Sequence, residues 1–265
     1  MLKADKELMV LPVLSGLASA VIVASFLLPL LSSSDGELED GSYVVLFGMY
    51  LVLTYVTIFF NAALVSAAHE RLSGGDPTVR SALRGAASRA GKILPWALVS
   101  ATVSIILRAL EERAGFLGRI VIGLIGMAWS VMTFLVLPII VIEGIGVGDA
   151  IKGSTKLFKR TWGENLAAQI GFSILGLVAV LPAIILLVAA GSSGLWVLVV
   201  LAVAWIVVVA IVIATLSGIF QTALYLYAKD GSVPGDYYRD DVFSNAFAQR
   251  GRRGGSSWGG GRAGT

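Results

Sequence analysis

Residues 149–164 read DAIKGSTKLFKRTWGE and place four bases between two long apolar stretches. When successive side chains are set about 100° apart, the apolar residues and Ser154 fall on one face and the bases on the other. The first face holds Ala150, Ile151, Ser154, Leu157 and Phe158, and the bases are Lys152, Lys156, Lys159 and Arg160. We expect an amphipathic helix, capped by Asp149, that lies on a membrane interface with its apolar face toward acyl chains or neighbouring spans.

The composition predicts that the whole chain is built for a membrane. Apolar residues make up 57% and charged residues 14% of the 265 residues, whereas an ordinary soluble domain carries about 25% charge. Six windows are nearly free of charge and long enough to cross a hydrocarbon core roughly 30 Å thick. They run over residues 8–31, 43–68, 92–110, 117–142, 165–190 and 195–228. Arg108 interrupts the third window, so whether this window crosses fully is left open.

We therefore predict an all-α fold, a polytopic bundle of six transmembrane helices with two amphipathic helices on the cytoplasmic interface. Residues 1–228 form the transmembrane domain in this prediction, and residues 229–265 form a cytoplasmic tail. From about residue 251 the tail is rich in Gly and basic residues, a composition typical of disordered chain.

The basic residues also predict the orientation of the spans. If both termini are cytoplasmic, that side receives 17 of the 20 Lys and Arg residues, and Lys and Arg near span ends are retained on the cytoplasmic side. The first loop, residues 32–42, carries four acids and no base and is an outer loop in this arrangement. The sequence thus predicts a multi-pass protein of the cell membrane with both termini in the cytoplasm.

The second loop repeats the pattern of the basic segment. Asp76 and Pro77 supply an expected helix start. After them, Val79, Ala82, Leu83, Ala86, Ala90 and Ile93 share one face, and Arg80, Arg84, Ser88 and Lys92 share the other. Residues 82–86, ALRGA, also align with residues 150–154, AIKGS. This similarity predicts a parallel internal repeat of span, interfacial helix and span. The alternative is that two polar loops have drifted toward similar composition.

Three stretches of the chain resemble a known family. The first reads Glu143-Gly144-x-Gly146, then Ala150-Ile151-Lys152-x-Ser154, then Leu157-Phe158-Lys159-Arg160-Thr161-Trp162-Gly163-Glu164. The others are LRALEERAGFLGRIVIGLIGMAWS (107–130) and ALYLYAKDGSVP (223–234). Together they are similar to a prokaryotic family of six-span integral membrane proteins of unknown function. The resemblance implies this fold and a membrane location, and it implies no activity.

The chemistry-bearing residues predict no catalytic, cofactor or metal site. There are no cysteines and His69 is the only histidine, whereas a zinc site needs about three or four ligands. We interpret His69 as a residue at the cytoplasmic end of a span, and Glu143 and Glu164 as able to pair with the bases between them. Charges at membrane depth mark proton relays, but the span interiors hold only uncharged polar candidates, which we expect to bond across helices or to their own helix. These are Asn61, Gln169, Thr215, Ser217 and Gln221.

We expect a protein that is not an enzyme and uses no cofactor. The favoured function is a scaffold, assembly or lipid-organising role at the cytoplasmic leaflet, and the alternative is a passive channel or transporter for an uncharged or amphipathic solute. Anionic lipids are the expected partners; protein partners or a homo-oligomer are left open, and nucleic acid is not expected. The expected headgroup contacts are Lys152, Lys156, Lys159, Arg160, Arg80, Arg84 and Lys92. Polar residues lining a continuous cavity would favour transport, and a tightly packed, dry bundle would favour scaffolding.

Overall fold

The computed structural model describes residues 6–33 and 40–230, without the side chains of residues 159–170 and of a few further positions, most of them near helix ends. The predictions for the acidic part of the first loop and for the tail from residue 231 lie outside these described residues. Every element in the described part is helical. The elements are α1 (Lys6–Ser33), α2 (Asp40–Leu72), α3 (Val79–Ala87), α4 (Ala90–Arg113), α5 (Phe116–Thr133), α6 (Val136–Pro138), η1 (Ile139–Glu143), α7 (Val147–Ser193) and α8 (Trp196–Asp230).

Six stretches of this structure are long and apolar enough to cross a membrane. They are Leu8–Pro29, Val44–Leu72, Ala90–Arg113, Phe116–Glu143, Ser173–Gly191 and Trp196–Asp230. The predicted all-α fold with six spans is confirmed, and the third span is long enough despite Arg108, because the helix runs 24 residues. The protein is an integral membrane protein of the multi-pass kind.

The fourth span is broken, although the sequence predicts it as one continuous window. The helix α5 ends at Thr133, and a turn at residues 134–135 leads into the short α6. Pro138 has no N–H to donate to the preceding turn, and a π-helical turn, η1, follows it. At Gly144 the backbone reaches φ +65°, a left-handed conformation that glycine adopts without strain. The span therefore exposes backbone carbonyls that need other partners.

The basic segment is not a separate helix. It forms the first turns of α7, which runs 47 residues from Val147 to Ser193. The predicted N-cap at Asp149 is wrong, because Gly146 is the cap residue and Asp149 lies in the first helical turn. Ala150 and Ser154 are fully buried, and α7 contacts α6 and η1. The predicted apolar face therefore packs against the broken fourth span.

The second loop forms a short helix, α3, and a turn precedes α4. The predicted cap at Asp76 is wrong, because the N-cap is Thr78, two residues later. Its Oγ1 accepts a hydrogen bond from the Ser81 N–H at 3.1 Å, and the Ser81 Oγ accepts one from the Thr78 N–H at 3.0 Å. This reciprocal arrangement is a capping box. Asp76 instead forms an ion pair with Arg71 at 3.2 Å.

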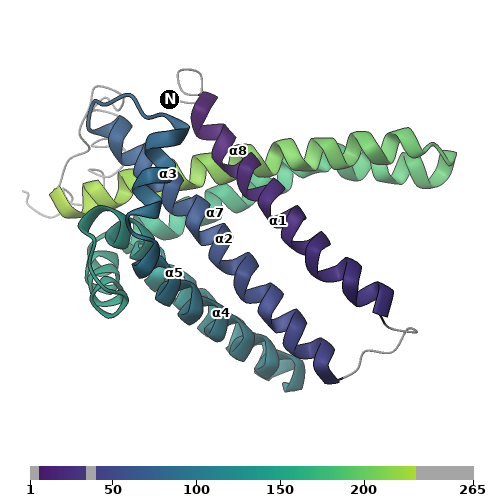
Figure 1. Cartoon of the computed structure of the whole chain (residues 1–265), viewed down its shortest axis with the longest axis horizontal. Helices are drawn as coiled ribbons and strands as arrows, with labels where there is room; N and C mark the ends of the chain where they lie inside the picture. Colours follow the sequence, from purple (N-terminus) through teal and green to yellow (C-terminus); the bar gives the residue numbers. More distant parts are fainter. Residues whose placement is uncertain (1–5, 34–39, 231–265) are drawn as a thin grey trace, which may run out of the picture.

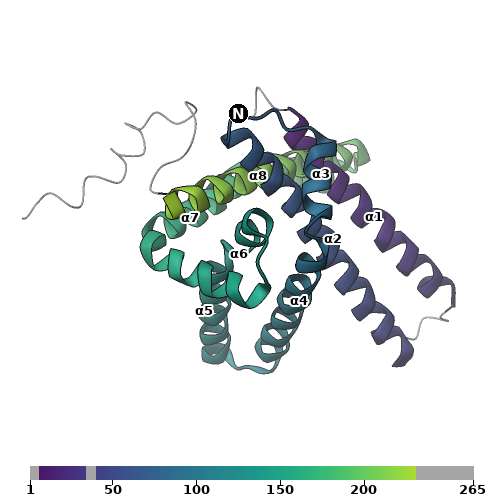
Figure 2. The ribbon, with the colours of Figure 1, turned by 60° about the vertical axis from the view of Figure 1, so that its left-hand side comes forward.

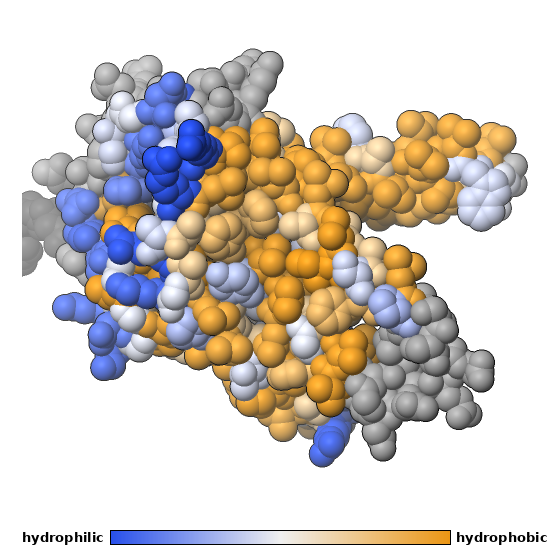
Figure 3. Space-filling model, in the orientation of Figure 1, coloured by the Kyte–Doolittle hydropathy of each residue, from blue (hydrophilic) through white to orange (hydrophobic). Residues whose placement is uncertain are grey.

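The helices converge at one end of the molecule, which we call the basic end because it carries Arg80, Arg84, Lys92, Lys152 and Lys229. Hydrophilic residues gather there in Figure 3. From this end, α1, α2, α4 and α5 run in one direction and the α7–α8 hairpin runs in another (Figures 1 and 2). The buried core lies at the same end, where α2, α3, α6, η1 and the last turns of α8 meet. Farther out, the helices expose large apolar side chains, as lipid-facing helices do.

Candidate functional site: a polar cavity at the broken fourth span

A cavity of about 440 Å³ lies between α2, α4, α5, α6 and α8, beside the break in the fourth span. We call it the polar cavity because six uncharged polar side chains line it. They are Asn61, Ser100, Ser130, Thr133, Ser217 and Gln221. Phe134 and Leu137, which lie at and just after the break, also line the cavity. The irregular backbone and the polar side chains thus share one space.

Side chains from other helices satisfy the backbone of the break. The Gln221 amide of α8 donates a hydrogen bond to the Phe134 carbonyl. From α7, the Ser154 Oγ accepts the Leu135 N–H at 3.2 Å and donates to the Met132 carbonyl at 2.5 Å. Because Ser154 and Leu135 are fully buried, water cannot replace these bonds. The break is therefore held in place by two neighbouring helices.

The basic end of the fourth span is held by a second set of contacts. The Tyr225 hydroxyl donates to Glu143 Oε1 at 2.5 Å, and Lys229 Nζ donates to the same oxygen at 2.9 Å. Arg89 Nε donates to the Val141 carbonyl at 3.3 Å, and Lys92 Nζ donates to the Gly144 carbonyl. Cations near a helix C-terminus are stabilising. These contacts join α4 and α8 to the end of η1.

Among the described side chains, Glu143 is paired with α8 and not with the basic segment, whose bases the sequence analysis allowed as its partners. It contacts α8 through Tyr225 and Lys229, whereas no ion pair between Glu143 and the described bases of the 149–164 segment is present. Lys152 pairs instead with Asp149 at 3.8 Å on the exposed side of α7. The Glu164 side chain lies outside the described residues.

The polar candidates of the span interiors divide into two groups. Asn61, Ser217 and Gln221 line the polar cavity. The Thr215 hydroxyl is buried and donates to the Ile211 carbonyl of its own helix at 2.8 Å, as expected of a packing role. The side chain of Gln169 lies outside the described residues.

The sequence analysis missed the three hydroxyls that α4 and α5 contribute, Ser100, Ser130 and Thr133. Ser and Thr are common in membrane helices because they can bond to a carbonyl of their own helix. Thr133 does so, donating to the Trp129 carbonyl at 2.7 Å. These hydroxyls lie near the aromatic pair Trp96 and Trp129, whose rings stack with their centroids 6.4 Å apart. Because this pair forms only in the folded protein, no signal in the sequence alone identifies the three residues.

The predicted headgroup contacts lie at the basic end on separate elements. Arg80 and Arg84 are exposed on α3, and Lys152 and Lys156 are exposed on α7. The helix α3 packs on α1 and α2, whereas the start of α7 packs on α6 and η1. Lys92 is exposed and bonds the Gly144 carbonyl. Lys159 and Arg160 are helical, but their side chains are outside the description.

His69 lies in the last turn of α2, as predicted. Its Nδ1 atom is buried and has no hydrogen-bond partner among the described residues. Within the same residues, no three side chains of the His, Asp and Glu types gather closely enough to hold a metal ion. We therefore take the polar cavity as the candidate functional site.

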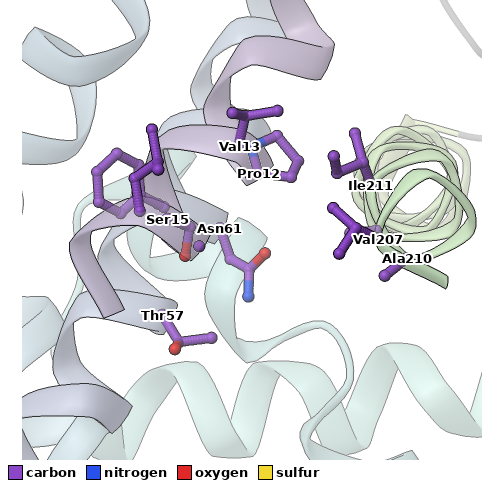
Figure 4. Close-up of a pocket in the computed structure, with 12 residues that line it drawn as sticks. Pro12, Val13, Ser15, Thr57, Asn61, Val207, Ala210 and Ile211 are labelled. Atoms are coloured by element: carbon purple, nitrogen blue, oxygen red, sulfur yellow. The ribbon is translucent and has the colours of Figure 1, made fainter. Parts of the chain in front are cut away.

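A second pocket, of about 550 Å³, adjoins the polar cavity between α1, α2 and α8. We call it the apolar pocket because most of its lining is hydrocarbon. Asn61 and Ala214 line both spaces. Figure 4 shows Asn61 of α2 near Pro12 of α1 on one side of the pocket, and Val207 and Ile211 of α8 on the other side. Two spaces of different character thus meet at one amide.

The comparison with protein families agrees with the resemblance found in the sequence. A family model described as a family of unknown function (DUF6159) matches residues 41–235, more than half of the chain. No curated protein and no solved structure matches the chain. The matched region includes the broken fourth span and the α7 and α8 residues that hold it. With its six apolar helices, this chain therefore belongs to that family of unknown function.

Proposed function

We propose that the protein binds an uncharged solute with hydrogen-bonding groups inside its helix bundle and lets this solute cross the membrane passively. This is the alternative that the sequence analysis left open beside a scaffold. The observation that supports it is the break in the fourth span, which borders a cavity lined by six uncharged polar side chains. Irregular backbone at membrane depth is tolerated where it is buried or lines a cavity, and broken helices often form substrate sites in transporters.

The lining of the polar cavity favours a neutral solute. None of the described residues around the cavity is charged, so an ion entering it would lose hydration without a compensating partner. Hydroxyl and amide groups can donate to and accept from a neutral solute. The volume of about 440 Å³ lies in the range of about 300–1,000 Å³ typical of small-molecule sites. Polyols are therefore suitable probes.

The test uses the full chain reconstituted in vesicles that are placed in a gradient of erythritol, an uncharged polyol. Light scattering should show faster reswelling than in vesicles without protein. Ser130→Leu, which puts a larger apolar side chain into the polar cavity, should slow the reswelling. Ser25→Leu is the matched control, because Ser25 is exposed on α1 and does not line the cavity. Reswelling at the rate of empty vesicles would refute passage of this class of solute.

A second candidate is the scaffold or lipid-organising role at the cytoplasmic leaflet. The exposed Lys152 and Lys156 on the first turns of α7 favour it, together with Arg80 and Arg84 on α3. Each Lys or Arg near an anionic surface contributes about 1 kcal/mol, reduced by salt. The four bases of the 149–164 segment together could contribute up to about 4 kcal/mol.

Replacing Lys152, Lys156, Lys159 and Arg160 by Gln tests this second role. The variant should co-purify less anionic lipid from mild detergent, while its helices stay in place because Ala150 and Ser154 remain packed. If the bases serve only to retain the loop during insertion, the inserted variant would bind as much anionic lipid as the parent. That result would argue against the lipid-organising role and leave polyol passage unaffected.

A further inference from the structure

The two pockets share a wall, which suggests a ligand with two unlike parts. The polar cavity and the apolar pocket adjoin at Asn61 and Ala214, which line both. One space offers hydroxyl and amide groups, and the other offers mainly hydrocarbon. A molecule that bends around Asn61 can place a polar group in the first space and a chain in the second.

Asn61 has the properties of a headgroup anchor. It lies 11 residues before the end of α2 at Leu72, which is about 16.5 Å along the helix from the basic end. Its amide has no hydrogen-bond partner among the described residues, although it can donate two bonds and accept others. Hydrocarbon supplies no partner at this depth, and an unsatisfied amide there is costly. A ligand with hydroxyl groups would satisfy this amide.

The apolar pocket is open to the hydrocarbon side of the helices. Val13 of α1 is 39% exposed and Val207 of α8 is 50% exposed, so a chain can enter between these two helices from the bilayer. Gly16 lies on the same wall of the pocket. None of the described residues lining this pocket or the polar cavity is charged, which disfavours a lipid with a phosphate or carboxylate head.

We infer that the ligand is a neutral single-chain lipid with a polyol headgroup, the chemical class of the monoacylglycerols. The headgroup binds Asn61 and the hydroxyls of the polar cavity, and the acyl chain lies in the apolar pocket between α1 and α8. This inference rests on the proposed function, because it assigns the same polar cavity to the polar part of the solute.

The experiment uses photolabelling of the purified full chain in nanodiscs with monopalmitoyl glycerol that carries a diazirine in its chain. Labels should map to α1 and α8 near Val13 and Val207. Gly16→Leu should reduce the affinity for the probe about tenfold, because its side chain displaces about two methylene groups of the ligand. Gly48→Leu is the matched control on α2. A methyl group placed at Gly16 or Gly48 meets no atom within 4 Å, so both variants should fold.

Two competitors separate the headgroup from the chain. Monobutyryl glycerol should compete weakly, because it offers the headgroup without a long chain, and palmitoyl glycerol phosphate should compete poorly because of its charge. Equal labelling of Gly16→Leu and the parent, or strong competition by the phosphate, would overturn the inference while leaving polyol passage unaffected. If the parent passes no polyol but Gly16→Leu still loses labelling, the passive pathway is refuted and the lipid site is supported.

Discussion

Ser154→Ala should destabilise the protein by removing the two hydrogen bonds that α7 makes to the break in the fourth span. The Ser154 Oγ accepts the Leu135 N–H at 3.2 Å and donates to the Met132 carbonyl at 2.5 Å. Both Ser154 and Leu135 are fully buried. The substitution removes only the oxygen, so the packing of the helix is otherwise retained.

The magnitude follows from the group left without a partner. A buried donor that loses its acceptor costs about 1–3 kcal/mol, and the second bond adds about 0.5–1.5 kcal/mol. We therefore expect a loss of about 1.5–4.5 kcal/mol in the free energy of unfolding. The neighbouring Thr155 is the matched control, since its hydroxyl donates only to the Ile151 carbonyl of its own helix at 2.9 Å. Thr155→Val should cost about 0.5 kcal/mol or less.

The assay is equilibrium unfolding in mixed detergent micelles for the parent and the two variants, followed by circular dichroism. Hydrogen exchange gives a local readout, because the Leu135 amide should exchange faster in Ser154→Ala than in Thr155→Val. If the two variants have equal stability, or if exchange around Leu135 is unchanged, Ser154 does not hold the break and our reasoning about this contact is wrong.

Further predictions concern the neighbouring contacts and the topology. Tyr225→Phe should lower the free energy of unfolding by about 1–2 kcal/mol, because it removes a hydrogen bond to the Glu143 carboxylate; an unchanged unfolding midpoint would show that Lys229 alone holds this carboxylate. Gly218→Val should destabilise the contact between α8 and α2, because a methyl group at Gly218 would lie 2.4 Å from Leu64 Cδ2; a thermal melt equal to that of the parent would contradict it. Single cysteines placed in residues 32–42 should react only from outside intact cells, and labelling from the cytoplasmic face alone would reverse the topology.

The spans could be predicted from the sequence because burial of apolar side chains in lipid needs long uncharged windows, and these windows are visible without a structure. The absence of a helix end after the basic segment could not be predicted in this way. The polarity of the chain changes near Glu164, yet no proline lies between Val147 and Pro182, and a change of polarity does not end a helix. The segment and the fifth span therefore form one helix, α7.

The polar cavity was only partly predictable. Asn61 and Gln221 are conspicuous because amides are costly in hydrocarbon, so their rarity marks them. Ser100 and Ser130 are inconspicuous because a hydroxyl can be satisfied within its own helix. Whether such side chains face each other depends on how α4, α5 and α8 pack, which a single apolar sequence does not encode in its periodicity.

A stripe of polar residues on α8 is the sequence signal that could have indicated the break in the fourth span. Gln221, Tyr225 and Lys229 are spaced by four residues, which places them on one face of α8, and a polar stripe of this kind in a membrane helix calls for partners. Two of these side chains meet Glu143, and the third meets the Phe134 carbonyl. Because Pro138 has no N–H, the Phe134 carbonyl four residues before it lacks its usual helical partner, and Gln221 of the stripe supplies one. Pro138 indicates that the fourth span bends, and the matching stripe on α8 explains why the bend is stable enough to border the polar cavity.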